Sequence, residues 1–264
     1  MHNPASGIYG FGLPVSTKGN YGSQAVWGFM STNGARIVGF EDGKEKIVFN
    51  SPKTIETYEF LKKLAKFTCP GAANMDWGMA ELMIRQGRFA TIMYNSAWLR
   101  QLDKDNPELA SKYAMTFLPR PRDGQIAHTG YPRAFTVTKA TVQKGHMEAV
   151  KKFLKWIYEP KNNATLLRME NAFFLPVTEG TANSKEFKDI PLVEKYWDMM
   201  EVQAKGLATA KVIGFPPGGM SRHAGAIESS FTLGAVLQKI VIDGWPVEKA
   251  VKWGQEQYEE IIRE

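Results

Sequence analysis

The chain has 264 residues, of which 44% are hydrophobic and 23% charged, a balance typical of a globular protein large enough to bury a core. Its 33 basic and 27 acidic side chains give a net charge of +6, but Lys and Arg are dispersed among acids, which argues against a nucleic-acid-binding stripe. The single cysteine excludes an internal disulfide, and no stretch approaches the roughly 18–20 apolar residues that span a bilayer.

The first residues, Met-His-Asn-Pro-Ala-Ser, lack the basic and apolar regions of a signal peptide. We therefore expect either a cytoplasmic protein or a chain that begins downstream of its export signal.

The first half of the chain alternates predicted strands and helices. Residues 8–13 predict a strand, 24–31 a short helix ended by Asn33-Gly34, and 38–49 a hairpin that turns at 41–44. Ser51 and Pro52 are typical of a helix start, and a second helix is expected over 77–86. Residues 89–94 predict a strand, and Asn95-Ser96 can cap a helix over 97–102.

Further strands are expected at 113–117 and 134–137, and the chain beyond Gly145 is almost wholly helical in pattern. Helices are predicted over 224–242 and from about 247 to 262. This order predicts an α/β domain with a helical carboxyl-terminal part.

Motifs for catalysis or for metal and cofactor binding are lacking. The four histidines have no metal-site spacing, and we find no phosphate-binding loop, dinucleotide fingerprint or nucleophile elbow. We therefore expect no cofactor, no metal and no catalytic residue, although a catalytic site discontinuous in sequence stays open.

Aromatic residues form 12% of the chain, and several of them stand where loops meet strand ends. Sugars stack an apolar face on aromatic rings and bind polar side chains at their edges. Tyr94-Asn95-Ser96-Ala97-Trp98 combines both properties at a strand-to-helix junction, which favours a sugar site, with core packing as the alternative for Trp98.

Several short motifs, in their order along the chain, resemble the family 1 extracellular solute-binding proteins, the group that includes maltose-binding protein. They are Ile8-Tyr9-Gly10-Phe11, Arg85-Gln86-Gly87-Arg88-Phe89-Ala90, Asn95-Ser96-Ala97-Trp98, Leu118-Pro119-Arg120-Pro121, Leu175-Pro176-Val177 and Trp245-Pro246-Val247-Glu248.

The resemblance implies a type II periplasmic-binding-protein-like fold, of which this chain would carry the carboxyl-terminal lobe of an incomplete two-lobed clamp. Residues 1–130 and 176–264 would form that lobe. Residues 131–175 would belong to the hinge and the amino-terminal lobe, so their apolar face (Met147, Val150, Leu154 and Ile157) would lack its usual cover.

The candidate ligand contacts come from this resemblance and, for Tyr94 and Asn95, from the strand-to-helix junction described above. They are Tyr21, Gln24, Trp27, Tyr94, Asn95, Trp98, Tyr131, Arg133, Arg222 and His223. Trp98 matches the family's stacking tryptophan, whereas Ser229 and Ser230 stand where maltose-binding protein has aromatics. Arg133, Arg222 and His223 would suit an acidic or phosphorylated sugar, but arginine also donates to ordinary hydroxyls.

The function implied is that of the substrate-binding component of an ABC importer for a mono- or oligosaccharide, not an enzyme, and weak or inactive as this chain alone. Expected partners are a sugar or sugar derivative, permease subunits, and the missing lobe or a second copy of the chain, without nucleic acid. The expected location is periplasmic or extracellular. The alternatives are a transferase on a similar α/β clamp and a basic nucleic-acid-binding module.

Overall fold

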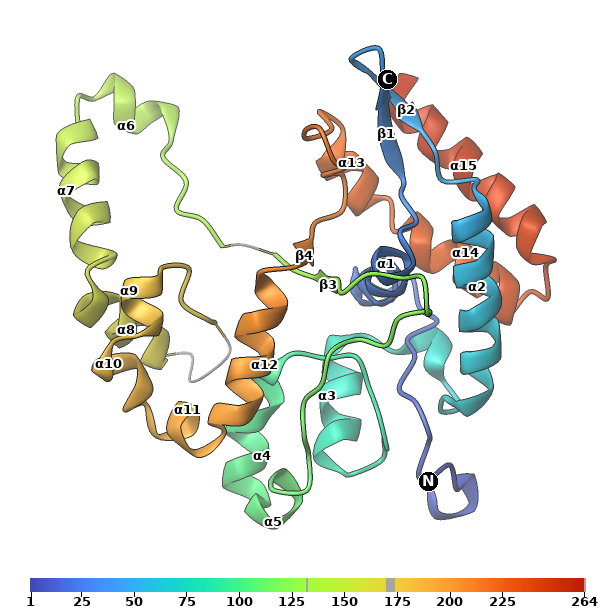
Figure 1. The fold of residues 1–264 in the computed structure, drawn as a ribbon, viewed down its shortest axis with the longest axis horizontal. Helices are drawn as coiled ribbons and strands as arrows, with labels where there is room; N and C mark the ends of the chain where they lie inside the picture. The colour runs from blue at the N-terminus through green and yellow to red at the C-terminus, as the bar shows by residue number, and fades with distance from the viewer. Residues whose placement is uncertain (132, 170–173, 264) are drawn as a thin grey trace. The chain divides into compact units, whose positions relative to one another are not determined.

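A computed structural model describes residues 1–131, 133–169 and 174–263 of the chain (Figure 1). It divides into two compact units: unit 1 comprises residues 1–94, 117–130 and 206–264, and unit 2 comprises 95–116 and 131–205. None of its described helices is long and apolar enough to cross a membrane.

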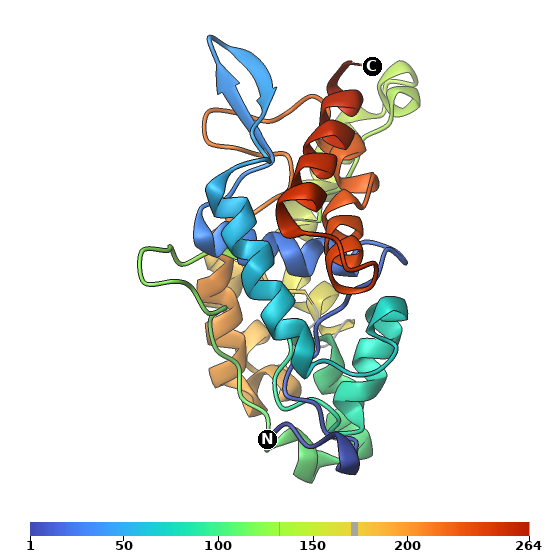
Figure 2. The same cartoon turned by 90° about the vertical axis from the view of Figure 1, so that its right-hand side faces the viewer.

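Unit 1 contains all four strands of the described chain and its three longest helices. Its elements are α1 Tyr21–Asn33, β1 Val38–Glu41, β2 Lys44–Ile47, α2 Pro52–Leu64, α3 Trp77–Arg85, β3 His128–Thr129, β4 Ala210–Lys211, α13 Ala224–Ser229, α14 Thr232–Val241 and α15 Val247–Arg263. Helix α1 forms its core: every residue of α1 except Gln24 is buried. Helices α2 and α14 pack against α1, and α15 packs against both α14 and α2 (Figures 1 and 2).

Local sequence signals set the ends of these elements. The Ser51 side chain accepts a hydrogen bond from the Thr54 amide, and Pro52 opens α2, as predicted. The predicted hairpin is formed by β1 and β2, with Asp42 and Gly43 at positive φ in its two-residue turn. Helix α1 ends at Gly34 as expected, although it begins at Tyr21, three residues before the predicted start.

The segments predicted as strands at 8–13 and 89–94 lie side by side in parallel, but as isolated bridges between Tyr9 and Phe89 and between Gly12 and Ile92. The Tyr9 and Gly12 amides donate to the carbonyls of residues 88 and 91. The Phe11 and Leu13 amides instead bond to the loop at residues 67–68. A loop therefore takes the place of a second neighbouring strand.

Two strand predictions are wrong, because residues 113–117 and 134–137 are irregular. A strand needs a neighbour to satisfy its backbone groups, and the described chain offers none to either segment. The predicted helix over 224–242 is interrupted: α13 ends at Ser229, and Phe231 adopts the left-handed conformation (φ 52°) before α14 begins.

Unit 2 is helical, as predicted for the chain beyond Gly145. Its helices are a 3-10 turn Ser96–Trp98, α4 Leu99–Asp105, α5 Pro107–Ala110, α6 Lys139–Gln143, α7 Met147–Ile157, α8 Pro160–Met169, α9 Glu179–Ala182, α10 Lys185–Lys188, α11 Pro191–Lys195 and α12 Trp197–Leu207, whose end belongs to unit 1. The expected segment 131–175 falls in unit 2 together with 95–116 and 176–205, and its residues 132 and 170–173 lie outside the described chain. Its assignment to a first lobe stays a prediction.

Candidate functional site

An aromatic cluster in unit 1 joins two of the predicted contacts, Tyr21 and Tyr94, through Trp77. The ring centroids of Tyr21 and Trp77 are 4.1 Å apart, those of Trp77 and Tyr94 5.2 Å, and those of Tyr21 and Tyr94 5.9 Å. The start of α1, the start of α3 and residue 94 supply the three rings.

The polar ends of these rings bond within the protein. The Tyr21 hydroxyl donates to the Met93 carbonyl (2.9 Å), the Trp77 indole N–H to the Asn20 side chain (2.9 Å), and the Tyr94 hydroxyl to the Trp77 carbonyl (3.1 Å). Burial raises the pKa of both tyrosines, so both phenols stay neutral donors. Tyr21 is fully buried and serves packing, whereas Trp77 and Tyr94 are half-buried and can present ring faces.

Gln24 and Trp27 lie on α1, one turn apart. Trp27 is buried, and its indole N–H donates to the Lys211 carbonyl of β4 (3.0 Å). Gln24 is the single half-exposed residue of α1, and its backbone carbonyl accepts from Thr129 (3.0 Å). Trp27 therefore anchors α1 to β4, while the Gln24 side chain is the more accessible of the two.

Four predicted contacts lie in unit 2. Asn95 caps the following turn by accepting from the Ala97 amide (2.9 Å), and Trp98 is only 6% exposed, with its ring 4.9 Å from that of Tyr113. Tyr131 is half-buried. Arg133 is exposed, with its guanidinium carbon 5.7 Å from the centre of the Phe174 ring.

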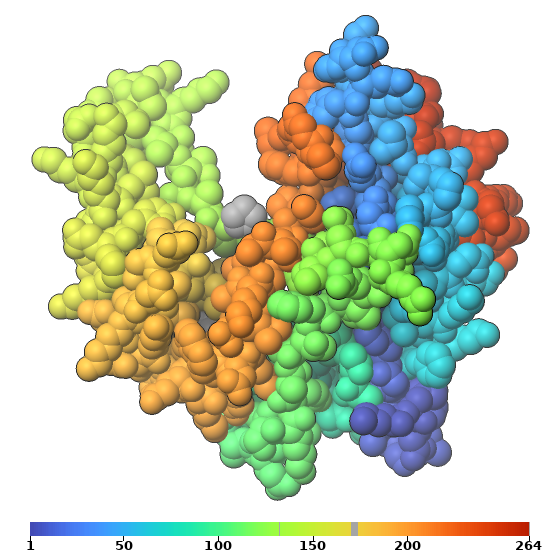
Figure 3. Space-filling view, viewed as in Figure 1, coloured from blue at the N-terminus to red at the C-terminus, as the bar shows by residue number. Residues whose placement is uncertain are grey.

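Arg222 and His223 meet a carboxylate that the sequence analysis missed. Glu45 of β2 accepts from the Arg222 amide (2.7 Å), and its second oxygen lies 2.7 Å from Nδ1 of His223. The Glu45 and His223 side chains are 14% and 17% exposed. Figure 3 shows the loop before α13, in orange, against the hairpin, in blue.

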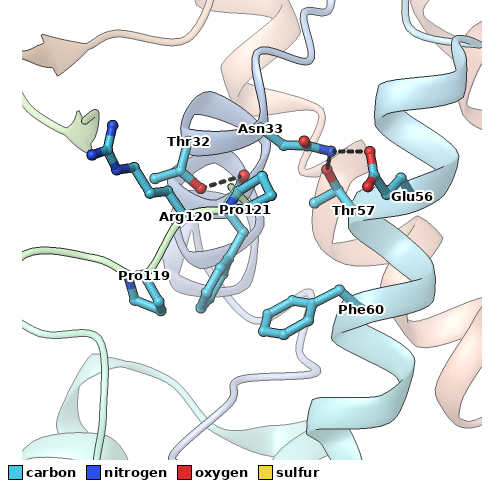
Figure 4. Close-up of a pocket in the computed structure, with 9 residues that line it drawn as sticks. Thr32, Asn33, Glu56, Thr57, Phe60, Pro119, Arg120 and Pro121 are labelled. Atoms are coloured by element: carbon cyan, nitrogen blue, oxygen red, sulfur yellow. Dashed lines mark hydrogen bonds between the residues drawn. The ribbon is translucent and has the colours of Figure 1, made fainter. Parts of the chain in front are cut away.

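An open pocket of about 210 Å³ lies elsewhere in unit 1, between the end of α1, α2 and the Pro119–Pro121 segment (Figure 4). Its walls are largely apolar, with Asn33 donating to Glu56 (3.1 Å) and Thr57 (3.2 Å) on one side. None of the ten predicted contact residues lines it. Among the described residues, no group of three His, Cys, Asp or Glu side chains could hold a metal ion.

Comparison with protein families shows which family the chain matches. The model of the bacterial extracellular solute-binding protein family matches residues 8–164, more than half of the chain. The chain belongs to this family. No curated protein sequence matches it.

Solved structures share the fold of this solute-binding protein at low sequence identity. Maltose-bound MalE3 of T. maritima matches with a TM-score of 0.70 and 17% identity, covering 98% of this chain and 62% of its own. Solute-binding proteins of Thermotoga lettingae with α-D-tagatose (TM-score 0.69, 18%) and of Agrobacterium radiobacter K84 with ribitol (0.68, 22%) each cover 98% of this chain and 61% of their own. The fold is therefore the expected periplasmic-binding-protein-like α/β fold, and the chain spans about three fifths of these structures.

We expect the contact between Glu45 and the loop to make the stability of this solute-binding protein pH-dependent. Partial burial alone would raise the pKa of Glu45, but hydrogen bonds from His223, the Arg222 amide and Ser221 outweigh it and hold the pKa below its ordinary value. A lowered pKa stabilises the fold above the unfolded value of about 4.3, and this contribution is lost as the pH falls further. Urea denaturation from pH ~6 to ~3 should show a smaller loss of the free energy of unfolding for Glu45→Gln than for the unchanged protein. An equal loss in the two proteins would contradict a stabilising role for the ionised Glu45.

Proposed function

We propose that this chain is part of the substrate-binding component of an ABC importer and that the complete clamp binds a mono- or oligosaccharide. The observation that carries the proposal is membership in the solute-binding family, supported by neighbours whose structures contain maltose, α-D-tagatose and ribitol. The family is one of extracellular proteins, which supports a periplasmic or cell-surface location.

The proposed mechanism involves no chemical change of the ligand. Ligand bridges two lobes and favours the closed state through its higher affinity for that state, and the closed form then docks on permease subunits. The family and the matched structures are binding proteins, which supports a non-catalytic role.

The half-buried rings and polar edges of unit 1 support this proposal. Trp77 and Tyr94 are the accessible members of the aromatic cluster, and Gln24 is the accessible residue of α1. Arg222 is a further exposed donor, on the loop before α13. Asn95, Trp98, Tyr131 and Arg133 stay proposed contacts from unit 2. Of these, Trp98 is the one whose burial favours packing instead.

Calorimetry tests the proposal. Because this chain spans about three fifths of the matched structures, we expect the 264 residues alone to bind maltose, D-tagatose and ribitol only weakly, in the millimolar range (roughly −4 kcal/mol). Micromolar binding by the isolated chain would contradict the expectation that it carries only part of the ligand site. If no member of a wide panel of sugars and polyols gives a heat of binding at millimolar concentration, the result would count against carbohydrate as the ligand.

We further propose that α7 and the residues before it contact a partner surface, either the other lobe or a second copy. The predicted face is less exposed than expected, since Ile157 is buried and Met147, Val150 and Leu154 are half-buried. The apolar surface is instead formed by aromatic side chains, each about half exposed: Phe135, Phe153 and Trp156. Their rings contact one another at 5.9–6.1 Å.

The charge around these rings favours a partner other than a second copy. Residues 139–161 contain six lysines and two glutamates, a net +4, so two copies facing each other would repel at low salt. We expect self-association to rise between low salt and about 0.5 M salt and to fall for Trp156→Lys, as measured by light scattering after size exclusion. Dimers that are stable at low salt and unaffected by Trp156→Lys would contradict this surface.

A further inference from the structure

One carboxylate, that of Glu45, ties two consecutive residues of the loop before α13 to the hairpin. It accepts from the Arg222 amide and contacts Nδ1 of His223, each at 2.7 Å, across more than 170 positions of sequence. The His223 amide also donates to the Ser221 hydroxyl at 3.0 Å, and Ser221 is buried. The loop and the imidazole ring are therefore held in one orientation by groups that are themselves largely buried.

This contact fixes where the proton of a neutral imidazole lies. A neutral ring carries one N–H, and an ionised carboxylate at 2.7 Å from Nδ1 requires that nitrogen to be the donor, because two acceptors facing each other would repel. Nε2 then carries the lone pair. In the described parts of the chain Nε2 has no hydrogen-bond partner, and the side chain remains 17% exposed, so a ligand atom can reach it.

We propose that Glu45 is a positioning residue for ligand recognition: its contact with Nδ1 fixes the neutral form of the His223 imidazole as the Nδ1–H tautomer, so that Nε2 accepts a hydrogen bond from a ligand hydroxyl. The proposal rests on the proposed sugar-binding function and deepens it. A hydroxyl can donate to this lone pair, whereas a carboxylate or phosphate offers only acceptors and is repelled there. His223 therefore selects neutral sugars and polyols over their acidic counterparts, while the exposed Arg222 serves as a donor to either.

The tautomer is measured by ¹⁵N NMR of the histidine rings at pH about 8, above the ordinary histidine pKa, with the signal assigned by its absence in His223→Asn. We expect Nδ1–H in the unchanged protein and a shift toward Nε2–H in Glu45→Met, which removes the acceptor at similar volume. The matched control is Glu41→Gln, since Glu41 lies on the same hairpin but pairs with Lys46. An Nε2–H ring in the unchanged protein, or the same tautomer in Glu45→Met, overturns the positioning role.

The ligand arm adds maltose, D-tagatose and ribitol at millimolar concentrations, with ribonate as the acidic counterpart of ribitol. We expect neutral ligands to shift the Nε2 signal of His223 with the tautomer unchanged, and ribonate to bind at least about tenfold more weakly than ribitol. Protonation of Nε2 on ribonate binding, or sugar-induced shifts elsewhere but not at His223, overturns the inference and leaves the proposed function standing. If none of these ligands shifts any signal of the protein, the result counts against both the positioning role of Glu45 and the proposed sugar-binding function.

Discussion

Replacing Gly22 with alanine will lower the free energy of unfolding by about 3 kcal/mol or more. Gly22 lies in the first turn of α1, and a Cβ there would stand 2.2 Å from the Ser16 carbonyl oxygen. The obstacle is backbone and not the end of a flexible side chain, so α1 or the 13–16 segment must move. Both are buried in the core of unit 1, where such a shift spreads to α14.

A graded set of glycine variants separates this clash from the general effect of alanine in a helix. Gly234 of α14 faces the same Ser16 oxygen, but its Cβ would lie 2.8 Å away, so Gly234→Ala should cost less than Gly22→Ala. Gly225 of α13 has no atom within 4 Å of such a Cβ, and Gly225→Ala should be neutral or stabilise by about 0.5–1 kcal/mol through helix propensity.

Urea denaturation followed by circular dichroism measures all three variants. The expected order of loss is Gly22→Ala, then Gly234→Ala, then Gly225→Ala. Equal stabilities for Gly22→Ala and Gly225→Ala would contradict the close approach of α1 to the Ser16 carbonyl.

The elements that were correct from sequence are those fixed by a few neighbouring residues. Ser51 and Pro52 start α2 because a cap and a preset φ act within one turn, and Asp42-Gly43 makes its turn for a similarly local reason. The strands expected at 113–117 and 134–137 failed because a strand depends on a partner far along the chain, which a β-forming composition does not supply.

The candidate site shows the same limit. The sequence singled out Tyr21 and Tyr94 as separate candidate contacts, but it did not predict that their rings meet, and it missed Trp77, which contacts both. It singled out Arg222 and His223 but not Glu45, which lies 178 positions from His223. No motif marks Glu45, because its partners lie on a loop far along the chain.

Replacing Trp98 with alanine should lower the free energy of unfolding by about 3–5 kcal/mol. Trp98 is 6% exposed, packs on Tyr113, and is followed by the fully buried Leu99 and by α4. Removing the indole would leave a cavity among these groups. The matched control is Trp156→Ala: Trp156 is 52% exposed on α7, so its loss should cost no more than about 1 kcal/mol.

This comparison also decides how Trp98 can act on a sugar. A tryptophan that stacks on a ligand must present a ring face, and such a ring contributes mainly to affinity in the bound state. If Trp98→Ala and Trp156→Ala both lower the stability to the same small extent, the buried indole of Trp98 does not stabilise the fold. Stacking on a sugar then becomes the main role of Trp98. If Trp98→Ala is strongly destabilising while Trp98→Phe regains most of the stability, Trp98 supports the Asn95 turn by packing, and the ring faces of Tyr94 and Trp77 are then the better stacking surfaces for a sugar in this chain.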